Sequence, residues 1–181
     1  MLDWTDEHKM LRDAIRSFVD KEIVPLRDEL EHGDLAPYGV LRKLFAAFGI
    51  DEMARDSFKK RLERDMAPRT TSPKDGSASG FDPALMLILL IELSRYCPGM
   101  VTALGVSVGL TASAIDSRGT PPQRERWVPD LLALEHIGAW ALTEPGSGSD
   151  AFGAMRASAR RDGDDYILNG SKTFITNGPY A

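Results

Sequence analysis

The sequence predicts an α+β fold: an N-terminal all-helical bundle over residues 1–135, followed by an incomplete antiparallel β-barrel or sandwich domain over residues 136–181. Three observations predict this fold. Up to about residue 134, apolar residues recur at steps of three and four, which is the period of a helix with one buried face. After residue 136 the chain changes to short alternating runs separated by glycine-containing turns. The three or four strands predicted there are too few to close a barrel or sandwich, so we expect a fragment or a half-length gene product.

The composition is that of a globular protein and excludes several classes of function. The 181 residues carry a net charge of −5 and are 43% hydrophobic, which allows a sizeable core and argues against a nucleic-acid-binding protein. The single cysteine, Cys97, excludes an intrachain disulfide and suits a reducing compartment, and we expect it to pack rather than react. The longest apolar run, residues 84–91, is much shorter than the about 20 residues that a membrane span needs. We therefore expect a cytoplasmic protein without a membrane span.

Two helices are predicted in the first fifty residues. A helical period covers residues 5–30, with Thr5 as N-cap, and Pro25 is expected to end or kink this helix because proline lacks an N–H. A second helix is predicted over residues 37–48, where Gly49 provides the stop.

Residues 51–81 interrupt this pattern and are predicted to form a basic, flexible insertion. Between positions 55 and 74 the chain carries seven basic and three acidic residues, and the following stretch is rich in proline, serine and glycine. A short helix over residues 56–66 is the alternative. The insertion is expected to be a solvated loop, although contact with the phosphate of a ligand or with a partner subunit stays open.

Three further helices are predicted before the β region. Asp82 and Pro83 form an N-cap followed by proline, and open a helix that is apolar nearly all round. Residues 100–115 form a helix rich in small residues. Thr120 and Gln123 form a capping box that opens a helix to about residue 134.

The β region is predicted to contain short strands and two turns. Residues 137–143 and 155–161 are predicted strands, the second ending at a turn over residues 162–164. Residues 166–168 form the next strand. Asn169-Gly170 is the strongest short hairpin signal, with a return strand over residues 173–176.

Two short polar stretches are candidates for ligand binding. The first, residues 141–153, reads Ala-Leu-Thr-Glu-Pro-Gly-Ser-Gly-Ser-Asp-Ala-Phe-Gly and follows a predicted strand. Its glycines and hydroxyls offer N–H and O–H groups to a ligand that approaches the backbone closely, such as a phosphate or a flat heteroaromatic ring. The second, residues 169–178, reads Asn-Gly-Ser-Lys-Thr-Phe-Ile-Thr-Asn-Gly and by itself is an ordinary hairpin.

Together, the two stretches resemble the signatures of the acyl-CoA dehydrogenase family, at the family's spacing. The order of the upstream helices agrees, and residues 119–131 resemble the segment that precedes the β domain in that family. The resemblance implies an N-terminal helical domain, a middle β domain and a C-terminal helical bundle, of which the bundle is absent from these 181 residues.

The resemblance also implies that FAD is the cofactor. Thr143 would bond the pyrimidine side of the flavin, and the Thr176 hydroxyl would bond flavin N5 and tune its potential. Ser149 would contact an FAD phosphate or the CoA part of the substrate. The cofactor-binding residues implied in this way are Trp140, Leu142, Thr143, Gly148, Ser149, Phe174, Ile175 and Thr176.

The family reaction is α,β-dehydrogenation of an acyl-CoA thioester, in which a carboxylate base removes the α-proton and a β-hydride passes to the flavin. The resemblance places that glutamate beyond Ala181, so Glu144 is not the base and the chain is expected to be inactive alone. It also implies electron-transfer flavoprotein as the electron acceptor, a role in lipid metabolism, and a homo-oligomer, either a dimer or a tetramer.

Two alternatives to this function remain. The chain is then either a half-length, non-catalytic subunit that stabilises a partner, or a relative similar to acyl-CoA oxidases that passes electrons to oxygen. The sequence downstream of Ala181 and the oxygen reactivity of the reduced flavin would separate these alternatives.

Overall fold

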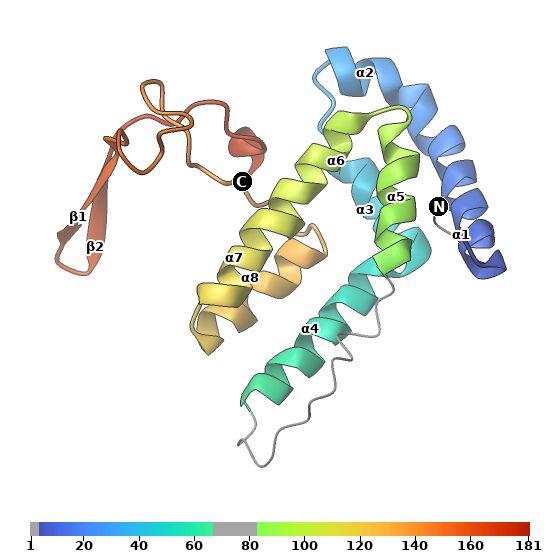
Figure 1. Cartoon of the computed structure of the whole chain (residues 1–181), viewed down its shortest axis with the longest axis horizontal. Helices are drawn as coiled ribbons and strands as arrows, with labels where there is room; N and C mark the ends of the chain where they lie inside the picture. Colours follow the sequence, from blue (N-terminus) through green and yellow to red (C-terminus); the bar gives the residue numbers. More distant parts are fainter. Residues whose placement is uncertain (1–3, 67–82) are drawn as a thin grey trace.

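The computed structural model describes residues 4–66 and 83–181, and Figure 1 shows a body of helices from which a hairpin projects. We call residues 4–138 the helical body and residues 139–176 the β arm. The helices and strands in chain order are α1 (Asp6–Phe18), η1 (Val19–Ile23), η2 (Val24–Leu26), α2 (Arg27–His32), α3 (Tyr38–Phe48), α4 (Ile50–Met66), α5 (Pro83–Ser94), α6 (Pro98–Leu104), η3 (Gly105–Ala112), α7 (Ser113–Arg118), α8 (Pro121–Leu132), β1 (Ser158–Asp162), β2 (Asp165–Asn169) and η4 (Gly178–Tyr180). The α+β fold is confirmed.

Local signals placed the helix ends correctly in the first fifty residues. The Thr5 hydroxyl accepts from the His8 N–H at 3.2 Å, which caps α1 as expected. The helix is not interrupted at Pro25 but changes to a π-helical turn and then a 3₁₀ turn, because proline cannot donate to the preceding turn. Gly49 ends α3 in the left-handed region, with φ at 62°.

The prediction of a flexible insertion was wrong for residues 51–66, which belong to the 17-residue helix α4; residues 67–81 lie outside the described residues. The helix is stabilised by a short apolar stripe. Phe58 and Leu62 lie one turn apart, are 2% and 7% exposed, and share an apolar cluster with Val128 and Leu131 of α8. This stripe was too short to stand out among the surrounding charges.

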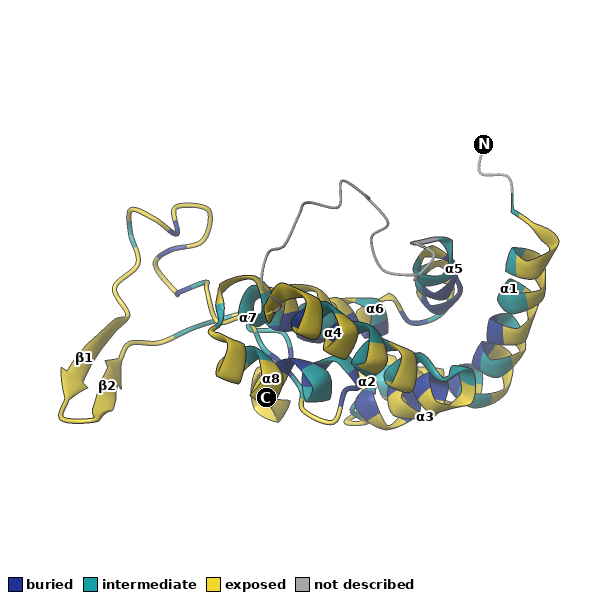
Figure 2. Ribbon diagram, turned by 90° about the horizontal axis from the view of Figure 1, so that it is seen from below, coloured by how far each residue is buried: buried dark blue, intermediate teal, exposed yellow. Residues whose placement is uncertain are grey.

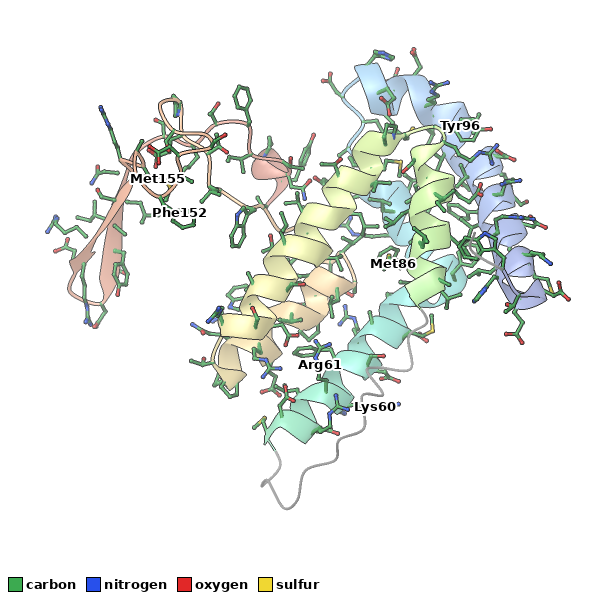
Figure 3. The ribbon with its side chains drawn as sticks, viewed as in Figure 1. Lys60, Arg61, Met86, Tyr96, Phe152 and Met155 are labelled. Atoms are coloured by element: carbon green, nitrogen blue, oxygen red, sulfur yellow. The ribbon has the colours of Figure 1, made fainter. Side chains whose placement is uncertain are left out.

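The basic residues of α4 that face the helical body are neutralised by neighbouring helices. Arg61 pairs with Asp116 of α7, and Arg55 pairs with Asp130 of α8 at 3.3 Å. Figure 3 shows Arg61 between α4 and α8, while Lys60 lies on the other side of α4. The positive charge that suggested a solvated loop is therefore partly used to attach a helix.

The helix predicted over residues 100–115 is the middle of a longer helical segment formed by α6, η3 and α7. Among the described residues, this segment, Pro98–Arg118, is long and apolar enough to cross a membrane, and 28% of its most apolar window is buried. A core helix of a soluble protein meets the same criterion, so the criterion by itself does not indicate a membrane. The π-helical part, η3, contains Gly105 and Gly109, and the wide turn there lies beside α8.

The largest apolar cluster lies in the helical body. Figure 2 shows the buried residues on the inward faces of the helices, whereas the strands of the β arm are exposed. Side chains from α1, η1, α3, α5 and α6 meet in this cluster, and its members with 0% exposure are Ile23, Leu41, Leu44, Leu93 and Leu134. The core therefore holds α1, α3, α5 and α6 as one unit.

The β arm contains one two-stranded antiparallel sheet. β1 pairs with β2 from Ser158 opposite Asn169 to Asp162 opposite Asp165. Gly163 begins the two-residue turn with φ at 64°, which only glycine adopts without strain. The predicted turn over residues 162–164 is confirmed, and all residues of both strands are exposed.

Two strand predictions in the β region were wrong. Residues 137–143 do not form a strand: the backbone N–H of Gly138 donates to the Ser107 hydroxyl at 2.9 Å, and its carbonyl accepts from Asn177. These bonds replace those that a neighbouring strand would make.

Asn169-Gly170 does not form a hairpin, and residues 173–176 do not form a return strand. Gly170 has φ at 139° and packs so closely on Ala157 that an added Cβ would lie 2.7 Å from its Cα. Phe174 has φ at 56°, which breaks the extended conformation.

Candidate functional site

The signature loop is a tight turn stabilised by its own polar groups. The backbone of Glu144 donates to the Ser147 carbonyl at 2.9 Å and accepts from the Ser147 N–H at 3.0 Å. Asp150 completes the loop: its carbonyl accepts from the Ser147 hydroxyl at 2.7 Å, and its carboxylate accepts from the Gly153 N–H at 3.1 Å. Gly148 and Ser149 lie exposed between these fixed points. The loop is thus preformed, with Gly148 and Ser149 exposed and Ser147 buried.

The Glu144 carboxylate ties this loop to two other segments. It accepts from the backbone N–H of Arg156 at 2.7 Å, from the Lys172 ammonium at 2.9 Å and from the Ala157 N–H at 2.9 Å, and it is 7% exposed. These contacts, with the Arg156 N–H first, lower the pKa of Glu144 to about 2. A carboxylate so stabilised in its ionised form is a poor proton acceptor, which supports the view that Glu144 is an anchor and not a base.

The two sequence motifs meet at the base of the β arm. The backbone N–H of Thr173 donates to the Thr143 carbonyl at 3.0 Å. Lys172 also donates to the Leu142 carbonyl at 2.9 Å, so one ammonium group contacts both the backbone and the carboxylate of the first motif. Residues 30 positions apart are therefore held side by side by one backbone bond and one charged side chain.

Several predicted cofactor-binding side chains lie on the outside of this junction. Trp140, Leu142 and Phe174 are 45%, 39% and 93% exposed, which is unusual for apolar side chains of this size. Thr143, Ile175 and Thr176 are half-buried. The positive φ of Phe174 is a strained conformation for a bulky residue, and such strain is concentrated at functional sites.

The Thr143 and Thr176 hydroxyls have no hydrogen-bond partner within the described ranges 4–66 and 83–181. Polar groups that are partly buried and unpaired beside exposed apolar rings fit a flat ligand with a polar edge, which is the shape and polarity of an isoalloxazine ring. The residues present therefore fit the flavin that the sequence predicted.

A hollow of about 620 Å³ with both polar and apolar lining lies elsewhere on the signature loop. It is lined by Glu144 to Gly146, by residues 153–157 and by Gly170 and Ser171, and does not include the predicted flavin-binding residues. Met155, which lines the hollow, and the neighbouring Phe152 lie on the β arm away from the helical body in Figure 3. The residues that line the hollow are therefore different from the residues predicted to bind the flavin.

Asn177 attaches the second motif to the helical body. Its side-chain amide donates to the carbonyls of Ala103 and Gly138, each at 2.9 Å, and its oxygen accepts from the Tyr38 hydroxyl at 2.7 Å. Sequence reasoning included Asn177 in the motif without a role and did not identify Tyr38. No sequence signal pointed to Tyr38, because it lies 139 positions away.

Among the described residues, no group of three or more His, Cys, Asp or Glu side chains forms a metal site. The residues predicted to bind a ligand offer hydroxyls, backbone amides and exposed apolar side chains.

Comparison with known proteins identifies the family. The family description "Acyl-CoA dehydrogenase, N-terminal domain" matches residues 5–54 and 51–135, and "Acyl-CoA dehydrogenase, middle domain" matches residues 139–181. The chain belongs to the acyl-CoA dehydrogenase family. The two N-terminal matches overlap within α4, the part of the family domain that sequence reasoning took for an insertion.

Curated and solved relatives agree with the family. The mitochondrial short-chain specific acyl-CoA dehydrogenase of Mus musculus is 33% identical over 172 residues, which is 95% of this chain and 37% of that protein. The butyryl-CoA dehydrogenase of Megasphaera elsdenii has a TM-score of 0.71 and 28% identity, over 100% of this chain and 43% of the solved one. An acyl-CoA dehydrogenase from Bacillus anthracis, solved in complex with FAD, has a TM-score of 0.67 and 30% identity, over 99% and 28%. This chain of the family thus spans 37% of the length of its curated mouse relative.

Proposed function

We propose that this chain takes part in the FAD-dependent α,β-dehydrogenation of an acyl-CoA thioester. The observation that carries the proposal is the junction of the two motifs, where the Thr173 N–H donates to the Thr143 carbonyl at 3.0 Å. This bond, together with the Lys172–Glu144 ion pair, joins the two threonine-containing segments and supports the proposal that they share one flavin-binding surface. Bound FAD would accept the hydride that leaves the substrate β-carbon.

In this proposal the residues of the chain bind and orient. Thr143 would donate to the pyrimidine side of the ring, and Thr176 would donate to the ring nitrogen at the reactive centre. Trp140, Leu142 and Phe174 would cover an apolar face of the ring and exclude water from it. Gly148 and Ser149 would contact the phosphates of FAD or CoA, for which an exposed loop of backbone N–H groups is suited.

On the family resemblance, we place the carboxylate that removes the α-proton outside these 181 residues; Glu144, whose ionised form three donors stabilise, is a poor candidate for this base. The electrons pass to an electron-transfer flavoprotein. A cytoplasmic location and a homo-oligomer are parts of the same proposal, and they rest on the composition and on the family respectively.

The proposal is tested by titrating FAD into the 181-residue protein and following flavin fluorescence. We expect weak, saturable binding, because the apolar side chains of the surface face solvent. The variant Thr176→Val removes one donor to the ring and is expected to raise the dissociation constant about 2- to 10-fold, as for the loss of one net hydrogen bond.

Thr102→Val is the matched control, since Thr102 lies exposed on α6 and its hydroxyl contacts only the carbonyl of Pro98 in its own helix. Equal FAD affinity in the Thr176→Val variant and the unchanged protein would contradict the assigned role. Absence of saturable binding in the unchanged protein would contradict the proposed function itself.

A further inference from the structure

The side chain that follows Thr176 is the best-anchored polar group between the second motif and the helical body. Asn177 is 7% exposed and its φ of 68° is one that asparagine tolerates better than most residues. In the described chain, all of its side-chain hydrogen bonds are long-range: they reach Ala103 in α6, Gly138 at the end of the helical body, and Tyr38 in α3. The position of the backbone immediately after Thr176 is thus determined by the helical body.

Tyr38 contacts a different atom of the Asn177 side chain from the other two partners. Ala103 and Gly138 both accept through backbone carbonyls, and both bind the amide nitrogen of Asn177. Only the Tyr38 hydroxyl donates to the amide oxygen, at 2.7 Å. The three contacts together satisfy both ends of the amide and allow one orientation of it.

Tyr38 is itself rigidly placed. It is the first residue of α3, is 6% exposed, and packs edge-to-face on Tyr180 with the ring centroids 5.3 Å apart. Burial, followed by the proximity of Tyr180, raises the pKa of Tyr38, so the phenol stays protonated and remains a donor well above neutral pH.

We propose that Tyr38 is a positioning residue for Thr176, which acts through Asn177 to fix the direction of the Thr176 hydroxyl. The inference rests on the proposed function, in which that hydroxyl contacts the reactive edge of the flavin. The first helices of the chain thereby contribute to flavin chemistry without touching the ring. A shift of the hydroxyl by a fraction of an ångström is enough to weaken a hydrogen bond that depends on distance and angle.

The test compares two variants that each remove one hydroxyl from the same pair of rings. Tyr38→Phe keeps the ring and removes the donor to Asn177. Tyr180→Phe is the matched control, because in the described chain Tyr180 contacts Asn177 through its backbone N–H, at 2.9 Å, and not through its hydroxyl. Chemical denaturation shows whether either variant is unfolded.

The first readout needs no flavin. The rotamer of Thr176 is measured by NMR side-chain couplings in the 181-residue protein. Tyr38→Phe is expected to convert a single Thr176 rotamer into an average of several and to shift the Asn177 side-chain amide signals, whereas Tyr180→Phe leaves both unchanged. An unchanged Thr176 rotamer in a folded Tyr38→Phe protein overturns the inference, as does an equal change in both variants.

The second readout uses added FAD and compares single and double variants. Tyr38→Phe is expected to raise the FAD dissociation constant about 2- to 10-fold in the unchanged background and to have little further effect in the Thr176→Val background. Equal effects in both backgrounds overturn the inference. If the unchanged protein binds no FAD, the proposed function fails, and the rotamer measurement still decides whether Tyr38 positions Thr176.

Discussion

The helical body and the β arm are held in shape by different interactions. In the body, apolar side chains from α1, α3, α5 and α6 form one cluster whose central members are fully buried. In the arm, both strands are exposed, and the fixed points are the polar contacts of Glu144 within the arm and of Asn177 immediately after it. Burial therefore determines the stability of the body, whereas a few charged and amide groups determine the conformation of the arm.

The body and the arm are expected to differ in how easily they open locally. A segment with few buried apolar contacts opens at a lower free energy than a packed core. The β arm is therefore expected to exchange its amide hydrogens faster than α5 and α6, without unfolding of the body. The surface proposed to bind the flavin thus lies on the part of the molecule that a ligand is able to reorganise.

The largest effect is expected in the core of the body. Leu93 in α5 is 0% exposed, and Leu93→Ala is expected to lower the free energy of unfolding by about 2–5 kcal/mol, because it leaves a cavity. Leu168→Ala in β2 is the control, since Leu168 is 76% exposed, and a change within about 0.5 kcal/mol is expected. Chemical denaturation measures both free energies of unfolding. Losses of similar size would contradict the claim that burial stabilises the body and not the arm.

A smaller effect is expected at the buried carboxylate of the body. Glu92 is 1% exposed and accepts from Arg16 Nη2 and from Arg95 Nη1, each at 2.8 Å. Glu92→Gln removes the charge from both contacts and is expected to cost about 1–3 kcal/mol at neutral pH, as measured by denaturation. Glu63→Gln on the exposed side of α4 is the control and is expected to change little.

The pH dependence of this effect has a defined sign. The hydrogen bond from Arg16, followed by that from Arg95, holds the pKa of Glu92 below its usual value in the folded protein. The contribution of Glu92 is therefore complete above the unfolded-state pKa of about 4.3 and is lost as the pH falls through the lower, folded value. The unchanged protein and the Glu92→Gln variant should thus converge in stability in acid; a constant difference would contradict this assignment.

The smallest effect on overall stability is expected in the β arm. Lys172→Met removes the ammonium group from Glu144 and Leu142 but leaves the two backbone N–H contacts of Glu144 in place. We expect an almost unchanged denaturation midpoint, together with faster amide exchange at Thr173. NMR titration should also show a Glu144 pKa that rises from about 2 but stays below its usual value.

The contribution of Glu144 depends on pH with the same sign as that of Glu92. Its folded pKa is lowered, so its contribution to the arm is present above about pH 4.3 and is lost as the pH falls toward 2. Arg160→Met, on the exposed strand β1, is the control for removal of a cation from the arm. If the control accelerates exchange at Thr173 as strongly, the arm is not held by the Lys172–Glu144 contact.

Sequence reasoning succeeded where the controlling chemistry is local. Thr5 and Thr120 cap their helices with groups three residues away, and Gly49 ends its helix by its own backbone conformation. It failed for α4, because the burial of two of its apolar residues depends on contact with α8. It failed again at Gly170, whose turn signal is overridden by close packing on Ala157.

The sequence alone determined the helix caps at Thr5, Gly49 and Thr120, the β1–β2 turn and the two motifs that identify the family. The tertiary structure decided what joins those motifs: the Glu144 carboxylate with Lys172, and Asn177 with Tyr38 across 139 positions. The physical reason is the range of the interactions. Caps and turns depend on hydrogen bonds within a few residues, whereas contacts between distant segments exist only once the packed helices have placed their partners.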